Sequence, residues 1–107
     1  MDTSTVEERS ITATQLVVTG DTLTVELSDG RSIAAPLAWY PRLLHGTAEE
    51  RGRWRLIGQG LGIHWPDLDE DISVASLLAG RMSAESPQSF QSWLGHRPNA
   101  ASPPTTP

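Results

Sequence analysis

A tight turn between two alternating runs constrains the fold of this chain more than any other feature. The run Leu23–Leu27 alternates apolar and polar residues, which is the period of two expected for a half-buried strand. Asp29 and Gly30 follow, and an Asp-Gly pair beside such a run is the strongest short-range signal of a β-hairpin, here with a type I′ turn. With the Thr-rich run Ile11–Thr19 before it and a return strand Arg31–Pro36 after it, the sequence predicts a three-stranded antiparallel meander.

Two short helices are predicted after the meander. Pro41 suits the first turn of a helix over Pro41–His45, because its missing N–H would be unpaired there anyway. Thr47 and Glu50 have the spacing of a capping box, in which each side chain bonds the other residue's backbone N–H. This box predicts a second short helix that ends before Gly52.

Further along the chain the pattern returns to strands. A second hairpin is predicted around Gly58–Gly60, and Pro66 stops its second strand. Ser73 is then expected to cap a helix, with Gly80 as its C′ residue. The order β-β-β-α-β-β-α predicts a small two-layer α+β domain, with one antiparallel sheet, helices gathered on one face and an optional C-terminal helix.

The chain is expected to divide into four segments. Residues 1–10 and the Pro-rich residues 98–107 are predicted to be disordered, since neither stretch can bury enough surface to order itself. Residues 11–82 are the predicted α+β domain, and residues 83–97 hold a possible short helix. That helix would carry three apolar residues at helical spacing, Phe90, Trp93 and Leu94.

Composition limits the cellular compartment of the protein and the kinds of site that it can form. The 107 residues include no cysteine, which excludes disulfides, thiolate metal sites and cysteine nucleophiles and favours a reducing cytoplasm. The N-terminus is polar and acidic, so we expect no signal peptide, and no apolar run approaches the roughly 20 residues of a membrane span. The net charge of −5 is a poor basis for nucleic-acid binding, which depends on neutralising phosphates.

One histidine and a run of carboxylates form the strongest candidate for a metal-binding or catalytic site in the sequence. His64 precedes the acidic segment Asp67–Asp71, which could offer ligands, including Asp69, to a divalent cation. The segment lacks the pattern of an EF-hand and a second histidine nearby. The favoured interpretation is that these carboxylates precede the helix near Ser73 and complement its dipole. A metal-binding or enzymatic domain built on this segment remains an alternative.

An arginine-rich stretch is the second candidate surface. Arg42, Arg53 and Arg55 could bind a partner's carboxylates or a phosphate, with His45 and Arg51 nearby. The favoured interpretation is that these arginines pair with the chain's own acidic residues. No serine, histidine and aspartate stand at a readable catalytic spacing, so we predict no catalytic residue, no metal and no cofactor.

Several segments together resemble the bacterial domain-of-unknown-function family 2442. The most specific is the stretch Gly62–Ser73, and the resemblance covers about residues 11–82. It implies a small antiparallel α+β domain. Members of that family are often encoded beside another small protein, which suggests the antitoxin-like half of a toxin–antitoxin pair. The resemblance supplies no catalytic residues.

We therefore expect a non-enzymatic protein-interaction module whose partner is a small protein encoded by a neighbouring gene. A nucleic-acid-binding accessory or regulatory domain that uses the Arg42–Arg55 face is the alternative. The residues expected to contact the partner are Arg42, Arg53, Arg55, His64, Asp69, Phe90 and Trp93.

Overall fold

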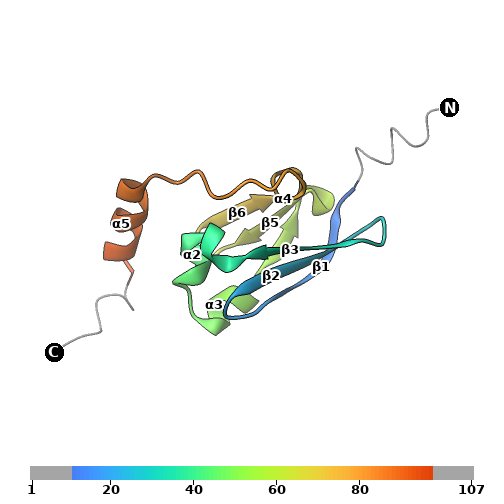
Figure 1. Cartoon of the computed structure of the whole chain (residues 1–107). Coiled ribbons are helices and arrows are strands. Elements are labelled where there is room, and N and C mark those ends of the chain that lie inside the picture. Colours follow the sequence, from blue (N-terminus) through green and yellow to red (C-terminus); the bar gives the residue numbers. More distant parts are fainter. Residues whose placement is uncertain (1–10, 98–107) are drawn as a thin grey trace.

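Two three-stranded antiparallel sheets dominate the computed structural model, which describes residues 11–97 (Figure 1). The disorder predicted for residues 1–10 and 98–107 lies outside the described residues. β1, β2 and β3 form the first sheet and β4, β5 and β6 the second, each in chain order. The strands are β1 (Ala13–Val18), β2 (Thr22–Leu27), β3 (Ser32–Pro36), β4 (Arg55–Ile57), β5 (Gly62–Trp65) and β6 (Glu70–Ser73).

The predicted meander is confirmed, but its turn is of another type. Gly30 N donates to Leu27 O at 3.0 Å, and Leu27 N donates to Arg31 O at 2.8 Å. Gly30 has a φ of +93°, whereas Asp29 is not among the residues with positive φ. The loop is therefore a type I turn followed by a left-handed glycine, the three-residue hairpin, and not the predicted type I′ turn, which needs two positive φ values.

The two predicted short helices form, although the first ends at Leu44 and the second includes Gly52. A 3₁₀ turn, η1 (Leu37–Trp39), leads into α2 (Pro41–Leu44), which has its proline at the first position. α3 (Ala48–Gly52) begins with the complete capping box, in which Thr47 N donates to Glu50 Oε1 at 2.8 Å and Glu50 N donates to Thr47 Oγ1 at 3.0 Å.

The second hairpin is present, with the 3₁₀ turn η2 (Gly58–Gly60) between β4 and β5, but the acidic segment after it was misread. Glu70–Ser73 is strand β6, which pairs with β5 so that Ile72 lies opposite Ile63. Ser73 does cap α4 (Val74–Leu78), yet the first turn of that helix contains no acidic residue. The carboxylates are therefore not helix-dipole partners, because pairing with β5 extends the backbone up to Ser73 itself.

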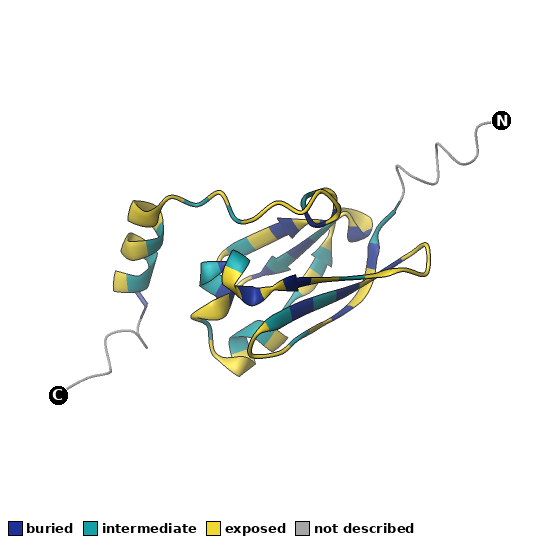
Figure 2. Cartoon of the chain, viewed as in Figure 1, coloured by how far each residue is buried: buried dark blue, intermediate teal, exposed yellow. Residues whose placement is uncertain are grey.

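One hydrophobic core takes residues from both sheets (Figure 2). Leu23 and Val25 on β2 and Ile63 and Trp65 on β5 are fully buried. The α+β class and the antiparallel pairing are confirmed. The second sheet packs against the first, and the short helices lie along the margins (Figure 1). The second layer is a sheet because the segment that contains Ile72 forms a strand and pairs with β5.

A connecting segment and a last helix complete the described chain. We call residues 81–86 the strap; its Ser83 N donates to Trp39 O at 3.0 Å. α5 (Pro87–Gly95) follows, capped by Ser86, whose Oγ accepts from Ser89 N at 3.0 Å. α5 lies on the α2 side of the domain (Figure 1). Among the described residues no helix is long and apolar enough to cross a membrane.

Candidate functional site

Arg42 is the centre of the contacts between the last helix and the rest of the domain. It stands on α2, and its Nε and Nη2 donate to the two carboxylate oxygens of Glu85 on the strap, at 2.9 and 2.5 Å. Its Nη1 donates to the backbone oxygen of Asp69 at 3.1 Å and lies 3.6 Å from the Asp69 carboxylate. These hydrogen bonds from Arg42 hold the pKa of Glu85 below its ordinary value.

Two guanidinium groups lie over the ring of Trp93 on α5. The Cζ atoms of Arg42 and Arg97 are 5.0 and 4.7 Å from the centre of its ring. Arg97 Nη2 in turn donates to Glu50 on α3 at 2.7 Å. Phe90 stacks on Trp93, with 5.7 Å between ring centres. We call Arg42, Glu85, Phe90, Trp93 and Arg97 the docking cluster.

The docking cluster joins α5 to the domain through stacked rings and largely buried ion pairs. No residue of α5 is fully buried, and Figure 2 shows only exposed and half-buried residues along this helix. Phe90 also contacts the edge of the His45 ring, at 5.1 Å between centres. α5 is thus held on the domain by two largely buried ion pairs and by cation–π contacts, and it contributes no fully buried residue of its own.

His64 and Arg55 lie on the solvent-facing side of the second sheet. His64 Nδ1 is 2.5 Å from Asp71 Oδ1 on β6, and Arg55 lies opposite His64 on β4. The row Arg55–His64–Asp71 therefore crosses all three strands. Within residues 11–97 no three metal-ligating side chains come together, at this row or elsewhere.

The arginines of the predicted face donate hydrogen bonds to separate acceptors within the chain. Arg53 Nε donates to Asp67 at 2.5 Å, and Arg51 donates to the backbone oxygen of Gly46 at 2.5 Å. Arg42 pairs with Glu85. Arg42 and Arg53 therefore pair with acidic residues of the chain itself, as the favoured interpretation of the arginines expected.

The structure thus divides the predicted contact residues among three places. Four of them meet around the docking cluster, namely Arg42, Asp69, Phe90 and Trp93. Arg55 and His64 share the outer face of the second sheet, and Arg53 stands apart beside Asp67.

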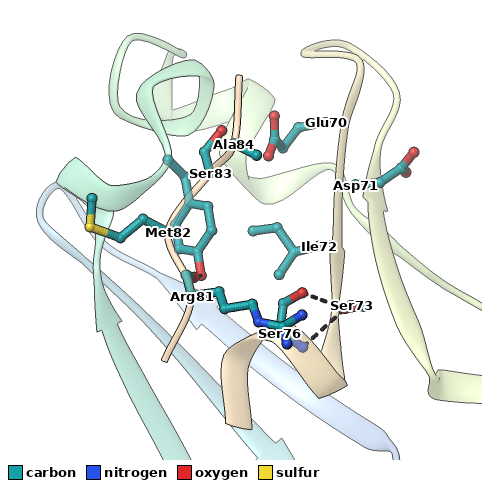
Figure 3. Close-up of a pocket in the computed structure, with 10 residues that line it drawn as sticks. Glu70, Asp71, Ile72, Ser73, Ser76, Arg81, Met82, Ser83 and Ala84 are labelled. Carbon is teal, nitrogen blue, oxygen red and sulfur yellow. Dashed lines mark hydrogen bonds between the residues drawn. The ribbon is translucent and has the colours of Figure 1, made fainter. Parts of the chain in front are cut away.

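A cavity of about 290 Å³ opens between β6 and the strap (Figure 3). Ile72 and Tyr40 line its wall, with Glu70 at one end and Arg81 and Ser76 at the other (Figure 3). Burial raises the pKa of Glu70 to about 7, and the negative charges of nearby carboxylates add to this, although Arg42 acts in the opposite direction.

Sequence reasoning did not single out Glu70, which it grouped with the acidic segment Asp67–Asp71 ahead of a helix. The sequence does hold a signal for Glu70, namely the alternation of side chains along a strand. Glu70 and Ile72 are two residues apart, so in a strand they share a face, while Asp71 lies on the other face. Glu85 and Arg97 were missed as well, and no local pattern in the sequence marks them.

Two small antiparallel sheets, the docking cluster and a small cavity define a small α+β domain. The chain belongs to the family described as protein of unknown function DUF2442, whose model matches residues 13–83, as the resemblance implied.

Two solved structures share this fold. A protein of unknown function from Rhodospirillum rubrum is 26% identical, with a TM-score of 0.61, over 71% of this chain and 94% of that one. An uncharacterized protein from Chromobacterium violaceum, solved by NMR, is 20% identical, with a TM-score of 0.62, over 89% of this chain and 84% of that one. No curated protein matches the chain.

Proposed function

We propose that this domain is a non-enzymatic protein-interaction module of the cytoplasm, and that α5 and the surface beneath it contact the partner. The observation that carries the proposal is the setting of Trp93, whose ring is contacted by two guanidinium groups and which stands on a helix with no fully buried residue. Tryptophan and arginine are the residue types that most often dominate binding interfaces.

The strength of the docking supports an exchangeable contact. A cation–π contact contributes about 0.5–2 kcal/mol, and the gain from a largely buried ion pair is offset by the desolvation of both charges. Two contacts of the first kind and two ion pairs, Arg42–Glu85 and Arg97–Glu50, hold α5. A partner that offers Phe90 and Trp93 a better groove can therefore take α5 from its own domain, in the helix-in-groove mode.

Charge indicates the kind of partner. The chain carries a net charge of −5, so a small basic protein is favoured by electrostatic steering. A partner encoded by a neighbouring gene, with this domain as the antitoxin-like member of the pair, fits that charge. The absence of cysteine fits a cytoplasmic pair.

The arrangement of the arginines favours this proposal over nucleic-acid binding. Arg42 and Arg53 are each paired with a carboxylate of the chain itself, which reduces the positive charge available to phosphates. Only part of the predicted Arg42–Arg55 face could therefore approach a nucleic-acid backbone without first breaking an ion pair.

The test is capture of the product of the neighbouring gene by the immobilised full chain. Phe90→Ala and Trp93→Ala should each weaken capture by about tenfold or more, as expected when an aromatic anchor is lost. Val17→Ala is the matched control, because Val17 is an exposed apolar side chain on the first sheet, away from α5. Equal capture by all four chains would contradict the role of α5. Failure to capture that product, with duplex DNA retained at about 150 mM salt, would favour the nucleic-acid alternative.

A further inference from the structure

The outer edge of β6 carries backbone groups that point away from its sheet. Val74 N donates to Leu61 O at 2.9 Å, which continues the β5–β6 register in which Ile63 faces Ile72. Since hydrogen-bonded pairs alternate in an antiparallel ladder, the backbones of Glu70 and Ile72 turn toward β5. Those of Asp71 and Ser73 consequently turn toward the free edge. In the described part of the chain, no backbone hydrogen bond joins β6 to the strap.

The strap runs beside this edge without pairing with it. Its polar contacts go to the opposite side, where Ser83 N donates to Trp39 O at 3.0 Å and the Tyr40 hydroxyl donates to Arg81 O at 3.2 Å. The strap is thus attached to the η1 side of the domain, and the cavity of about 290 Å³ lies between it and β6 (Figure 3). A space of this size admits one long side chain.

Glu70 gives this cavity its chemistry. Its carboxylate is half-buried and has no hydrogen-bond partner within residues 11–97, since Arg42 is occupied by Glu85. The charged and titratable groups around Glu70 are Tyr40, Arg42, Asp69, Asp71 and Glu85, and Arg81 lines the far end of the cavity. Arg42 and Glu85 neutralise each other. This leaves Asp69 and Asp71 as the unneutralised charges nearest Glu70, so the local balance of charge at that end favours an added cation.

We propose that this cavity binds one cationic side chain, arginine or lysine, from an extended segment of a partner protein that pairs with the free edge of β6. This inference rests on the proposed function in that the ligand is a protein. An unpaired edge strand supplies backbone affinity, and a cavity for an alternate side chain supplies specificity, which is the β-augmentation mode of recognition. The negative charge around Glu70 selects the cation.

The cavity also fixes the position of that cation along the segment. Side chains two residues apart in the bound segment face Glu70 and Ile72, so an apolar residue stands two positions from the cation on the same face. Arg81 stands at the opposite end of the cavity (Figure 3) and repels a second cation there. The preferred segment therefore has a single basic residue in an alternating apolar pattern.

The test uses a capped seven-residue peptide of alternating Thr and Val with one central Arg, titrated into the full ¹⁵N-labelled chain. Binding should shift the amide signals of Asp71 and Ser73, and replacing the Arg with its uncharged isostere citrulline should weaken binding by about tenfold or more. Glu70→Gln should have the same effect. Glu26→Gln, on the exposed face of β2, is the control and should bind as the parent chain does.

The pH dependence gives a second readout. With a pKa of about 7, about a tenth of Glu70 is ionised at pH 6 and about nine-tenths at pH 8. The Arg peptide should therefore bind about tenfold more tightly at pH 8 than at pH 6, and Glu70→Gln should abolish this difference.

Equal affinity for the citrulline peptide, shifts confined to α5, or no binding at all would overturn the inference. Its failure is distinguishable from failure of the proposed function. A chain that captures the neighbouring gene's product but shows no Glu70-dependent peptide binding refutes this site alone. A chain that binds the Arg peptide through Glu70 but captures no product supports this site and counts against the proposed function.

Discussion

Arg42 and Glu85 are separated by 43 residues and form a two-point ion pair in which both side chains are largely buried, at 14% and 13% exposure. The pair fixes the strap against α2 and places α5 where Trp93 meets the Arg42 guanidinium. The family match covers residues 13–83, so Arg42 lies inside it and Glu85 lies just beyond its end. The contact that positions α5 therefore connects the family domain to a segment outside the match.

Removing the guanidinium of Arg42 should destabilise the chain. Arg42→Ala leaves Glu85 partly buried without its partner and removes one cation from Trp93, which should cost about 1.5–3 kcal/mol in the free energy of unfolding measured with urea. Arg53→Ala is the control, because the Arg53–Asp67 pair is far more exposed, at 59% and 37%, and its loss should leave the stability nearly unchanged. Equal costs for the two variants would mean that the burial of the Arg42 pair contributes nothing.

Acid should weaken the same contact. The pKa of Glu85 is lowered by its hydrogen bonds to Arg42, so the stabilisation is present above the ordinary glutamate pKa and is lost as pH falls through the lowered value. Glu85→Gln should therefore be about 1–2 kcal/mol less stable than the parent chain at pH 7, and this difference should shrink progressively below about pH 4.5. A difference that stays constant from pH 7 to pH 3 would show that the charge of Glu85 is irrelevant.

The parts of the fold that local sequence determines were predictable. The meander follows from alternation, and the capping box and the Ser73 cap each depend on residues three apart. β6 was missed because its four residues become a strand only by pairing with β5, and three of the four are polar. The turn type was wrong because Asp-Gly is compatible with two hairpin loops, and the loop length is fixed by the register of β2 with β3.

The candidate site was predictable in residue type but not in arrangement. Arg42, Phe90 and Trp93 were identified as contact residues, yet their meeting depends on Glu85 and Arg97, which pair with residues 43 and 47 positions away. No periodicity spans such distances. Glu70 differs from these residues. Once a strand is assumed, its position two residues before Ile72 predicts that the two side chains lie on the same face.

The left-handed conformation of Gly30 should make the first hairpin sensitive to substitution. A β-branched residue at a φ of +93° is strained, so Gly30→Val should cost about 1–3 kcal/mol in thermal or urea unfolding. Gly20→Val is the control, because Gly20 has no positive φ and an added Cβ meets no atom within 4 Å. If the two variants melt at the same temperature, the glycine requirement assigned to this hairpin loop is wrong.

Glu70 should make the stability of the chain fall as the pH rises. Burial raises its pKa from 4.5 to about 7, so the folded chain holds a proton that the unfolded chain has lost between these values. The stabilisation from that proton is fully present below pH 4.5 and is lost as pH rises through 7. Glu70→Gln carries no such group and should be about 1–2 kcal/mol more stable than the parent chain at pH 8, allowing for partial solvent screening, but nearly equal to it at pH 4. Urea unfolding at pH 4, 6 and 8 measures this difference.

Glu26→Gln is the control and should change stability by less than about 0.5 kcal/mol at each pH. A Glu70→Gln variant that is less stable than the parent chain at pH 8 would mean that the carboxylate has a favourable partner in the cavity.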